Sequence, residues 1–256
     1  MDILYTPPVF LYVATLTGLF LGSFYTVCVH RFVTGESIVF PGSHCPHCGH
    51  WLAWWENIPV LSYIMLLGAC RSCRAPIPWR YPALELLSGL VALLLALVFG
   101  PTRFWLVYMV FGGIFLIASF IDLEIYILPD RLTYPAALLA LLTPLVLPVL
   151  WTETVLGAAF GAGLFWALQQ TYLRWRNIDA LGTGDIKLML SLGALTGITG
   201  LPFMILCSAL SALLGAVVYM RRSSGQGLQT AIPFGPFLCL GAFITLLWGD
   251  ILQHLL

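Results

Sequence analysis

The chain has 256 residues, of which 60% are hydrophobic and 9% are charged, and its mean hydropathy is +0.96. This composition excludes an ordinary water-soluble globule and predicts an all-α polytopic membrane protein embedded in the lipid bilayer. Lys and Arg together number 11, as do Asp and Glu. Because the chain has no excess of basic charge, nucleic-acid binding is not expected.

No Lys or Arg precedes the first apolar run, unlike in a cleavable signal peptide, so we expect the first span to be retained. Windows of about 20 apolar residues predict about eight transmembrane helices. The sixth is the shortest, and the tight turn at Thr199–Pro202 leaves open a seven-span arrangement with a re-entrant segment. The predicted spans are residues 9–29, 82–99, 104–121, 132–150, 153–173, 186–199, 201–220 and 234–254.

The cations indicate an orientation. When the spans are threaded alternately, only Arg103 falls on one side of the membrane, and the positive-inside rule makes the other side cytoplasmic. Both termini are then on the non-cytoplasmic side. The cations on the cytoplasmic side are Arg31, Arg71, Arg74, Arg80, Arg131, Arg174, Arg176, Lys187, Arg221 and Arg222.

A cytoplasmic loop between the first two spans, at about residues 35–80, carries two C-x-x-C pairs that resemble the ligand pairs of a zinc ribbon. The cysteines are Cys45, Cys48, Cys70 and Cys73. Cytoplasmic thiols stay reduced, so structural zinc is favoured over disulfides and a redox dithiol is the rival. The neighbouring histidines could replace a cysteine as ligands; they are His44, His47 and His50. The tryptophans Trp51, Trp54, Trp55 and Trp79 suit either a membrane-interface belt or packing inside the loop.

A possible chemical centre lies at Gly182-Thr183-Gly184-Asp185, which opens an apolar segment. Alone, Asp185 could be an ordinary helix start. Asp122, however, closes the third predicted span, and two complete spans separate the two acids, so both reach the cytoplasmic face. Two carboxylates near hydrocarbon can share one proton, as in an aspartic protease. The glycines would let a peptide backbone approach the acid.

Other acids compete with Asp122 as the partner of Asp185. Asp130 is typical of a helix cap, and Glu124 lies further along the cytoplasmic connection. Glu85, just inside the second span, is a further buried candidate, whose structural alternative is an ion pair with Arg80.

Several motifs in order resemble those of type IV prepilin peptidases, bacterial inner-membrane proteases that share a Gly-x-Gly-Asp motif with presenilins. The matching residues are Gly22-Ser23-Phe24, His30-Arg31, the run from Cys45 to Pro82, Asp122, Leu128-Pro129-Asp130, Gly182 to Lys187, and Ile232 to Phe237. One departure is Gly68-Ala69-Cys70, where many relatives carry a Lys before the Cys.

The resemblance implies that Asp122 and Asp185 are catalytic, that Gly182, Gly184 and Lys187 belong to the supporting motif, and that the four cysteines bind zinc. It implies a cytoplasmic cut that removes the short basic leader of prepilins or pseudopilins of a type IV pilus or type II secretion system. It also implies N-methylation of the new N-terminus with S-adenosylmethionine. The sequence has no glycine-rich signature for that cofactor.

The resemblance also suggests two domains, an N-terminal membrane region with the zinc module and a methyltransferase portion at 1–103, and a six-span peptidase domain at 104–256. A proton- or cation-coupled transporter is an alternative function, because paired intramembrane acids also form proton relays. A non-catalytic zinc-bearing membrane scaffold is a third.

Overall fold

The computed structural model describes residues 7–176, 181–222 and 233–253. Over these residues the chain is helical, with two isolated bridges and no strand, which confirms the all-α prediction. Parts of the topology and motif predictions rest on residues outside this description. These are the segment 1–6, Ile232 and the side chains of Arg176, Arg221 and Arg222. The chain forms two compact units, residues 1–121 and 122–256. The predicted domain boundary after residue 103 stays a prediction.

Four described helices are long and apolar enough to cross a membrane. They are α1 (Pro8–Thr34), α3 (Arg80–Phe99), α4 (Arg103–Ile125) and the part Thr183–Val217 of α7 (Thr183–Arg222). A membrane protein is thus supported. The remaining predicted spans fall on α5 (Asp130–Leu141), α6 (Trp151–Arg176) and α8 (Gly235–Gln253), where α5 has only 12 residues, so the count of eight crossings stays a prediction.

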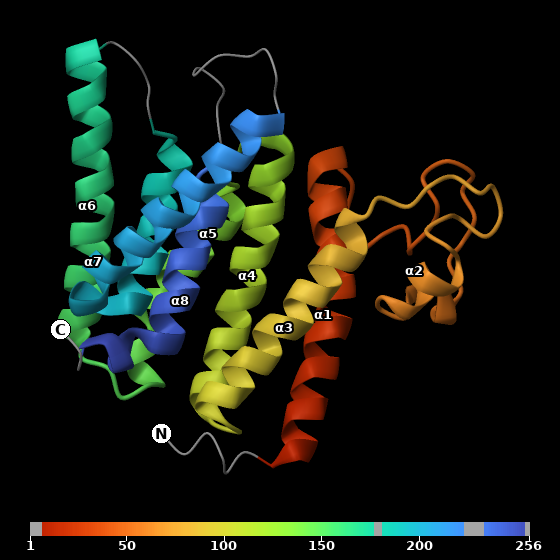
Figure 1. The fold of residues 1–256 in the computed structure, drawn as a ribbon, viewed down its shortest axis with the longest axis horizontal. Coiled ribbons are helices and arrows are strands. Elements are labelled where there is room, and N and C mark those ends of the chain that lie inside the picture. The colour runs from red at the N-terminus through yellow and green to blue at the C-terminus, as the bar shows by residue number, and fades with distance from the viewer. Residues whose placement is uncertain (1–6, 177–180, 223–232, 254–256) are drawn as a thin grey trace. The chain divides into compact units, whose positions relative to one another are not determined.

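Within the first unit, α1 and α3 lie side by side (Figure 1) because glycines remove the side chains between them. A Cβ atom on Gly22 would lie 2.7 Å from the Cα atom of Glu85, and one on Gly18 would lie 2.6 Å from the Ser88 carbonyl oxygen. The two helices therefore approach closely at Gly18 and Gly22, as small residues one turn apart in a membrane helix allow.

The loop between α1 and α3 is a small irregular module with a 3-10 turn, η2 (Trp54–Asn57), and one short helix, α2 (Leu61–Met65). Arg31, in the last turn of α1, is 5% exposed and holds the start of this module. Its guanidinium donates hydrogen bonds to the carbonyl oxygens of Ser37, Ile38, Pro41 and Gly42. Four hydrogen bonds from one arginine thus fix a segment that has no helix of its own.

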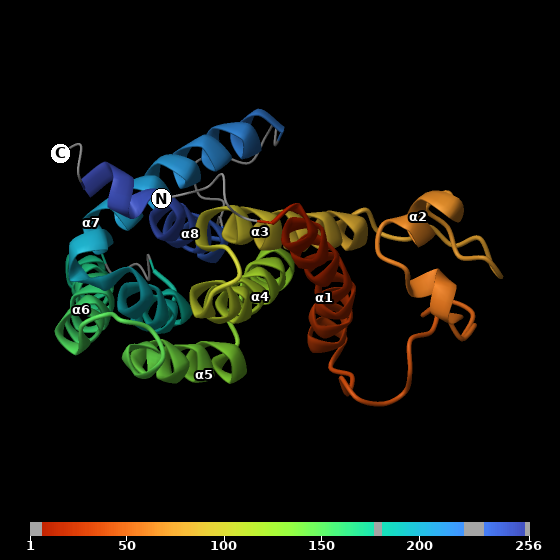
Figure 2. The ribbon, with the colours of Figure 1, turned by 90° about the horizontal axis from the view of Figure 1, so that it is seen from below.

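In the second unit, α7 contacts α5, α6 and α8, and Figure 2, which looks along the helices, shows these helices packed around it. A short 3-10 turn, η3 (Thr143–Leu145), follows α5. The crossing of α6 and α7 is close because Gly157 and Gly193 each face the other's backbone, where a Cβ would collide with the opposite carbonyl oxygen. The second unit is therefore organised around α7.

α7 reverses direction at Gly197, which has a non-helical backbone with φ 68° and ψ 170°. Figure 1 shows that both the beginning and the end of α7 lie at the same end of the unit. The sequence predicted this turn at Thr199–Pro202; the break comes earlier because glycine adopts positive φ readily. Glu153 supports the turn, since its Oε2 accepts hydrogen bonds from the Thr199 N–H at 3.3 Å and from the Thr199 hydroxyl at 3.2 Å.

Candidate active site and metal centre

Asp122 lies near the C-terminal end of α4 and is 5% exposed. The helix stops at Tyr126, whose φ of 56° turns the chain and whose N–H donates to the Asp122 carbonyl oxygen at 2.9 Å. The turn leads to Leu128, which is 7% exposed, and then to Pro129, which precedes α5. The Leu128-Pro129-Asp130 motif is thus a short connection that directs a leucine back into the unit.

Asp185 lies in the first turn of α7 and is half-buried. Its N–H donates to the Gly182 carbonyl oxygen at 3.1 Å, which closes the first turn. From α6, the Gln169 side chain donates to the Leu181 carbonyl oxygen at 2.8 Å. Gln169 therefore fixes the segment that leads into the Gly-Thr-Gly-Asp motif.

Gly235 and Leu128 connect the two acids. The N–H of Gly235, the first residue of α8, donates to Asp122 Oδ2 at 3.0 Å. Leu128 fills the space on both glycines: a Cβ on Gly184 would lie 2.8 Å from Leu128 Cβ, and one on Gly235 would lie 3.2 Å from Leu128 Cδ2. The carboxylates of Asp122 and Asp185 are close enough for the charge of Asp122 to act on Asp185. The structure thus brings the two predicted acids together.

The two glycines of the motif have different surroundings. Gly184 leaves room for Leu128, whose Cβ lies where a side chain at position 184 would be, and the expected approach of a peptide to the acid stays a prediction. Gly182 is exposed, and a Cβ there would lie 3.3 Å from Asp185 Oδ2. Any side chain at position 182 would therefore lie directly beside the carboxylate of Asp185. Glycine leaves this space free on a surface that is open to a second molecule.

The competing acids have other partners. Asp130 Oδ1 forms an ion pair with Lys187 Nζ at 2.6 Å, and the ammonium group also lies 5.0 Å from the centroid of the Tyr134 ring. Glu85, in the first unit, accepts a hydrogen bond from the Val60 N–H at 2.7 Å. Glu124 is half-buried on the last turn of α4. Asp122, in contrast, accepts its hydrogen bond from the backbone N–H of Gly235 in α8.

The four cysteines of the loop module form the candidate metal centre. Their sulfur atoms all lie within 4.8 Å of one another, with Cys45 Sγ 3.8 Å from Cys73 Sγ and Cys48 Sγ 3.9 Å from Cys70 Sγ. Zinc bound tetrahedrally by thiolates at about 2.3 Å places the sulfur atoms about 3.8 Å apart. The donor set and its spacing therefore fit a zinc ion.

Two similar turns position the cysteines. In the first, the Cys45 N–H donates to the His50 carbonyl oxygen at 2.9 Å, and in the second the Cys70 N–H donates to the Ala75 carbonyl oxygen at 2.8 Å. The backbone N–H groups of Cys73 and Ser72 lower the pKa of the Cys70 thiol, which favours the thiolate that binds metal.

The histidines near the cysteines do not join this cluster. His50 Nε2 lies 3.3 Å from Glu56 Oε2, and His44 Nδ1 lies 3.0 Å from the Gly42 carbonyl oxygen. Within residues 7–176, 181–222 and 233–253, the side chains grouped closely enough to hold a metal ion are the four cysteines alone. A site of four thiolates, without histidine, is thus the arrangement that the structure supports.

Reasoning from the sequence missed the roles of Gly235, Leu128 and Arg31. A signal existed for the first two, because Leu128-Pro129 and Pro233-Phe234-Gly235 are turn sequences that end beside apolar helices. Nothing in the local sequence placed α8 on Asp122, since the hydrogen bond joins residues 113 positions apart.

Comparisons with known proteins agree with the motifs. Residues 16–99 match the Bacterial Peptidase A24 N-terminal domain, and residues 109–219 match the Type IV leader peptidase family. The prepilin leader peptidase/N-methyltransferase of Aeromonas hydrophila is 38% identical over 216 residues, 84% of this chain and 74% of that protein. Those of Burkholderia pseudomallei and Pseudomonas aeruginosa are 36% and 35% identical, covering 92% and 95% of this chain and 84% and 92% of theirs. No solved structure matches significantly.

Proposed function

Because the chain belongs to the type IV leader peptidase family, we propose that it is a membrane aspartic endopeptidase that removes the short basic leader from type IV prepilins or pseudopilins, with Asp122 and Asp185 as its catalytic acids. One observation carries the assignment of these residues. The buried Asp122 and the half-buried Asp185 come together at one end of the second unit, where the charge of Asp122 acts on Asp185 and Leu128 packs against both Gly184 and Gly235. The family membership favours this function over the transporter alternative.

The mechanism needs one ionised and one protonated carboxyl group. The ionised acid takes a proton from a water molecule as the water oxygen attacks the scissile carbonyl carbon, and the other acid donates its proton to the carbonyl oxygen. When the gem-diol intermediate collapses, the C–N bond breaks, the new amine leaves with the proton of the acid that took one, and the other acid takes back a proton from a hydroxyl group of the intermediate as the new carbonyl forms, which restores the pair. The Gly235 N–H keeps Asp122 oriented through these steps, because its hydrogen bond fixes one carboxylate oxygen.

The described cations of the second unit support a cytoplasmic location for this chemistry. Arg131 lies in the first turn of α5, Arg174 in the last turn of α6 and Lys187 in the first turns of α7, all at the end of the unit that carries Asp122 and Asp185. By the positive-inside rule this end is cytoplasmic. We therefore place the chain in the bacterial inner membrane with about eight crossings and both termini outside the cytoplasm, in service of a type IV pilus or type II secretion system.

The proposal includes a structural zinc ion held by Cys45, Cys48, Cys70 and Cys73, whose spacing fits the metal. It also includes N-methylation of the new N-terminal residue with S-adenosylmethionine as the methyl donor. This second activity rests on the names of the relatives and on the sequence resemblance.

The test uses purified full-length protein and a prepilin, with the product analysed by mass spectrometry. Asp122→Asn and Asp185→Asn should each abolish leader removal while the protein still accumulates in the membrane. The competing acids provide matched controls: Glu124→Gln and Asp130→Asn should retain cleavage. Full cleavage by either catalytic variant would overturn the assignment. Added labelled S-adenosylmethionine shows in the same experiment whether the product carries a methyl group.

A further inference from the structure

α2 has the composition of a segment that avoids water. No charged residue occurs between Asn57 and Ala69. The four largest exposed side chains of α2 and the turn after it are apolar, namely Leu61, Ile64, Met65 and Leu67 at 57%, 60%, 68% and 85% exposure. No residue of α2 is buried against the rest of the chain. Its apolar surface is therefore unpartnered within the described first unit.

Two hydrogen bonds fix the position of α2 along the axes of α1 and α3. We call this position the level of α2, because it sets how deep α2 lies relative to the ends of the membrane helices. The Ser23 hydroxyl of α1 donates to the Asn57 carbonyl oxygen at 3.4 Å, and the Val60 N–H donates to Glu85 Oε2 of α3 at 2.7 Å. Ser23 precedes the predicted end of its span by six residues, about 9 Å, and Glu85 follows the predicted start of its span by three, about 5 Å. Interfacial helices lie about 5–10 Å deep at the boundary of headgroups and acyl chains, which is the level of α2.

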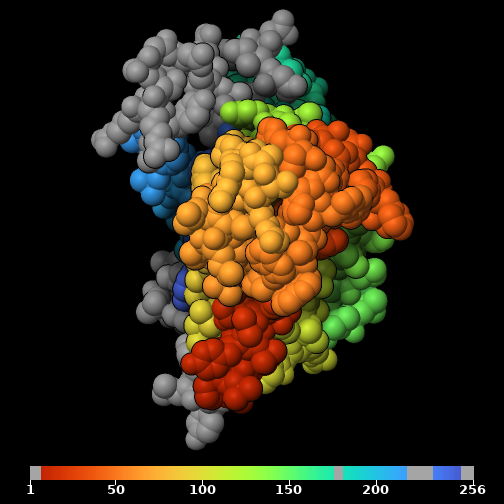
Figure 3. Space-filling view, turned by 90° about the vertical axis from the view of Figure 1, so that its right-hand side faces the viewer, coloured from red at the N-terminus to blue at the C-terminus, as the bar shows by residue number. Residues whose placement is uncertain are grey.

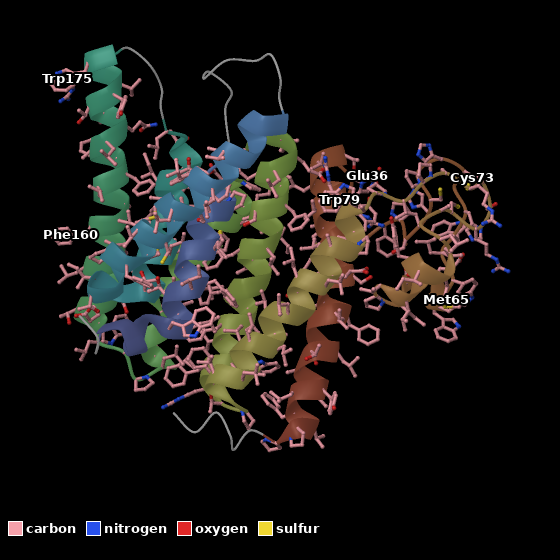
Figure 4. All side chains as sticks on the ribbon, viewed as in Figure 1. Glu36, Met65, Cys73, Trp79, Phe160 and Trp175 are labelled. Atoms are coloured by element: carbon pink, nitrogen blue, oxygen red, sulfur yellow. The ribbon has the colours of Figure 1, made fainter. Side chains whose placement is uncertain are left out.

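The figures agree with this level. In Figure 4, Met65 lies further from the end of α1 that carries Glu36 than Trp79 and Cys73 do, along the direction of the helices. In Figure 3, the module covers the C-terminal part of α1 on this face, while the N-terminal part of α1 remains visible below it. α2 is therefore beside the membrane helices, whereas Cys73 is near the level of their ends.

The backbone of the segment suits a lipid environment. The N–H groups of Leu66, Leu67, Gly68 and Ala69 all donate to carbonyl oxygens within the segment. Backbone groups that are satisfied internally are tolerated in hydrocarbon, where unpaired ones are costly. The exposed side chains of α2 can therefore enter the acyl chains without leaving these N–H groups unpaired.

The charges nearby are complementary to a membrane surface. Arg71 and Arg74 come six and nine residues after the end of α2 and are exposed, and the Arg71 guanidinium lies 5.0 Å from the centroid of the Trp55 ring. Anionic headgroups attract such cations, and tryptophan favours the same interface. The module thus presents apolar side chains on α2 and the turn after it, and exposed basic side chains a few residues later in the chain.

We propose that α2 with Leu67 is a lipid anchor, which inserts Leu61, Ile64, Met65 and Leu67 into the cytoplasmic leaflet beside α1 and α3 and so fixes the metal module against the membrane. The occupant of this surface is bilayer lipid. Acyl chains of the bilayer surround α2 at this depth in every state of the protein, whereas a prepilin helix could cover the surface only while substrate is bound.

The experiment uses the full-length zinc-loaded protein in vesicles of phosphatidylethanolamine and phosphatidylglycerol, without prepilin. A photoreactive benzophenone amino acid replaces Met65 in one variant, Leu67 in a second and the exposed Ser72 of the metal module in a control. After irradiation, intact-mass analysis should show phospholipid adducts at positions 65 and 67 several-fold more often than at position 72. The zinc content of each variant shows that the module is folded.

Two outcomes would overturn the proposal. The first is a lipid adduct yield at positions 65 and 67 no greater than at position 72. The second is the replacement of lipid adducts by prepilin adducts when purified prepilin is added, which would make the surface a substrate site. Because adduct formation needs no turnover, its result is independent of the assignment of Asp122 and Asp185.

Discussion

Replacing Gly235 with alanine tests the geometry of the acid pair directly. The N–H of Gly235 binds Asp122 Oδ2 at 3.0 Å, and an added Cβ would lie 2.8 Å from the same oxygen and 3.2 Å from Leu128 Cδ2. Ordinary van der Waals contact begins at 3.4 Å. The carboxylate must therefore move by about 0.6 Å relative to α8, and Leu128 limits movement in the other direction.

The shift should reduce turnover more than substrate binding. A misplacement of about 1 Å in a catalytic constellation can lower the rate about a hundredfold, so we expect Gly235→Ala to lower kcat by about tenfold to a hundredfold. This corresponds to about 1.4 to 2.7 kcal/mol of activation free energy. KM for the prepilin should change little, because the added methyl group faces Asp122 and Leu128 and not an exposed surface.

The assay is leader removal measured at several prepilin concentrations, together with the thermal unfolding midpoint of each variant. Gly163→Ala is the matched control, since a Cβ on this exposed glycine of α6 would meet nothing within 4 Å. The control should keep wild-type kcat and unfold at the same temperature or slightly higher, because alanine favours a helix over glycine.

Normal kcat in Gly235→Ala with an unchanged unfolding midpoint would refute the reasoning, because Asp122 would then function without the position that the structure gives it. A fall in kcat with a rise in KM and a large drop in the midpoint would point instead to general misfolding. The comparison with Gly163→Ala separates these outcomes from the effect of adding a methyl group to any helix.

Three further changes test other parts of the structure. Gly157→Ala should destabilise the second unit by about 1–3 kcal/mol, measured as a lower unfolding midpoint than that of Gly163→Ala, because its Cβ would collide with α7. Cys45→Ser should remove zinc, measured by metal analysis, and expose the loop module to proteolysis, whereas the intact protein should carry one zinc ion per chain. Lys187→Met, Asp130→Asn and the double variant should give a coupling free energy below about 1 kcal/mol, measured by unfolding, because the carboxylate of Asp130 is 58% exposed.

Much of the site was predictable because its signals are local. Two C-x-x-C pairs predict four thiol ligands whatever the fold around them, and the structure places these sulfur atoms within 4.8 Å of one another. Asp122 and Asp185 were predicted from their places at the ends of apolar runs, from the parity of the spans and from the family motifs, and their catalytic role stays a prediction. The position of the α7 turn was less accurate, because Pro202 and Gly200 suggested a later break than Gly197.

The sequence by itself determined the helical class, the membrane environment and the residues able to carry chemistry, because composition, periodicity and motif spacing depend on neighbouring residues. The tertiary structure alone decided how those residues are held. Gly235 reaches Asp122 across 113 positions, Leu128 occupies the space that Gly184 leaves, and the hydrogen bonds to Ser23 and Glu85 set the level of α2. Such contacts form only when distant helices pack, and no local pattern encodes which side chain will fill a given space.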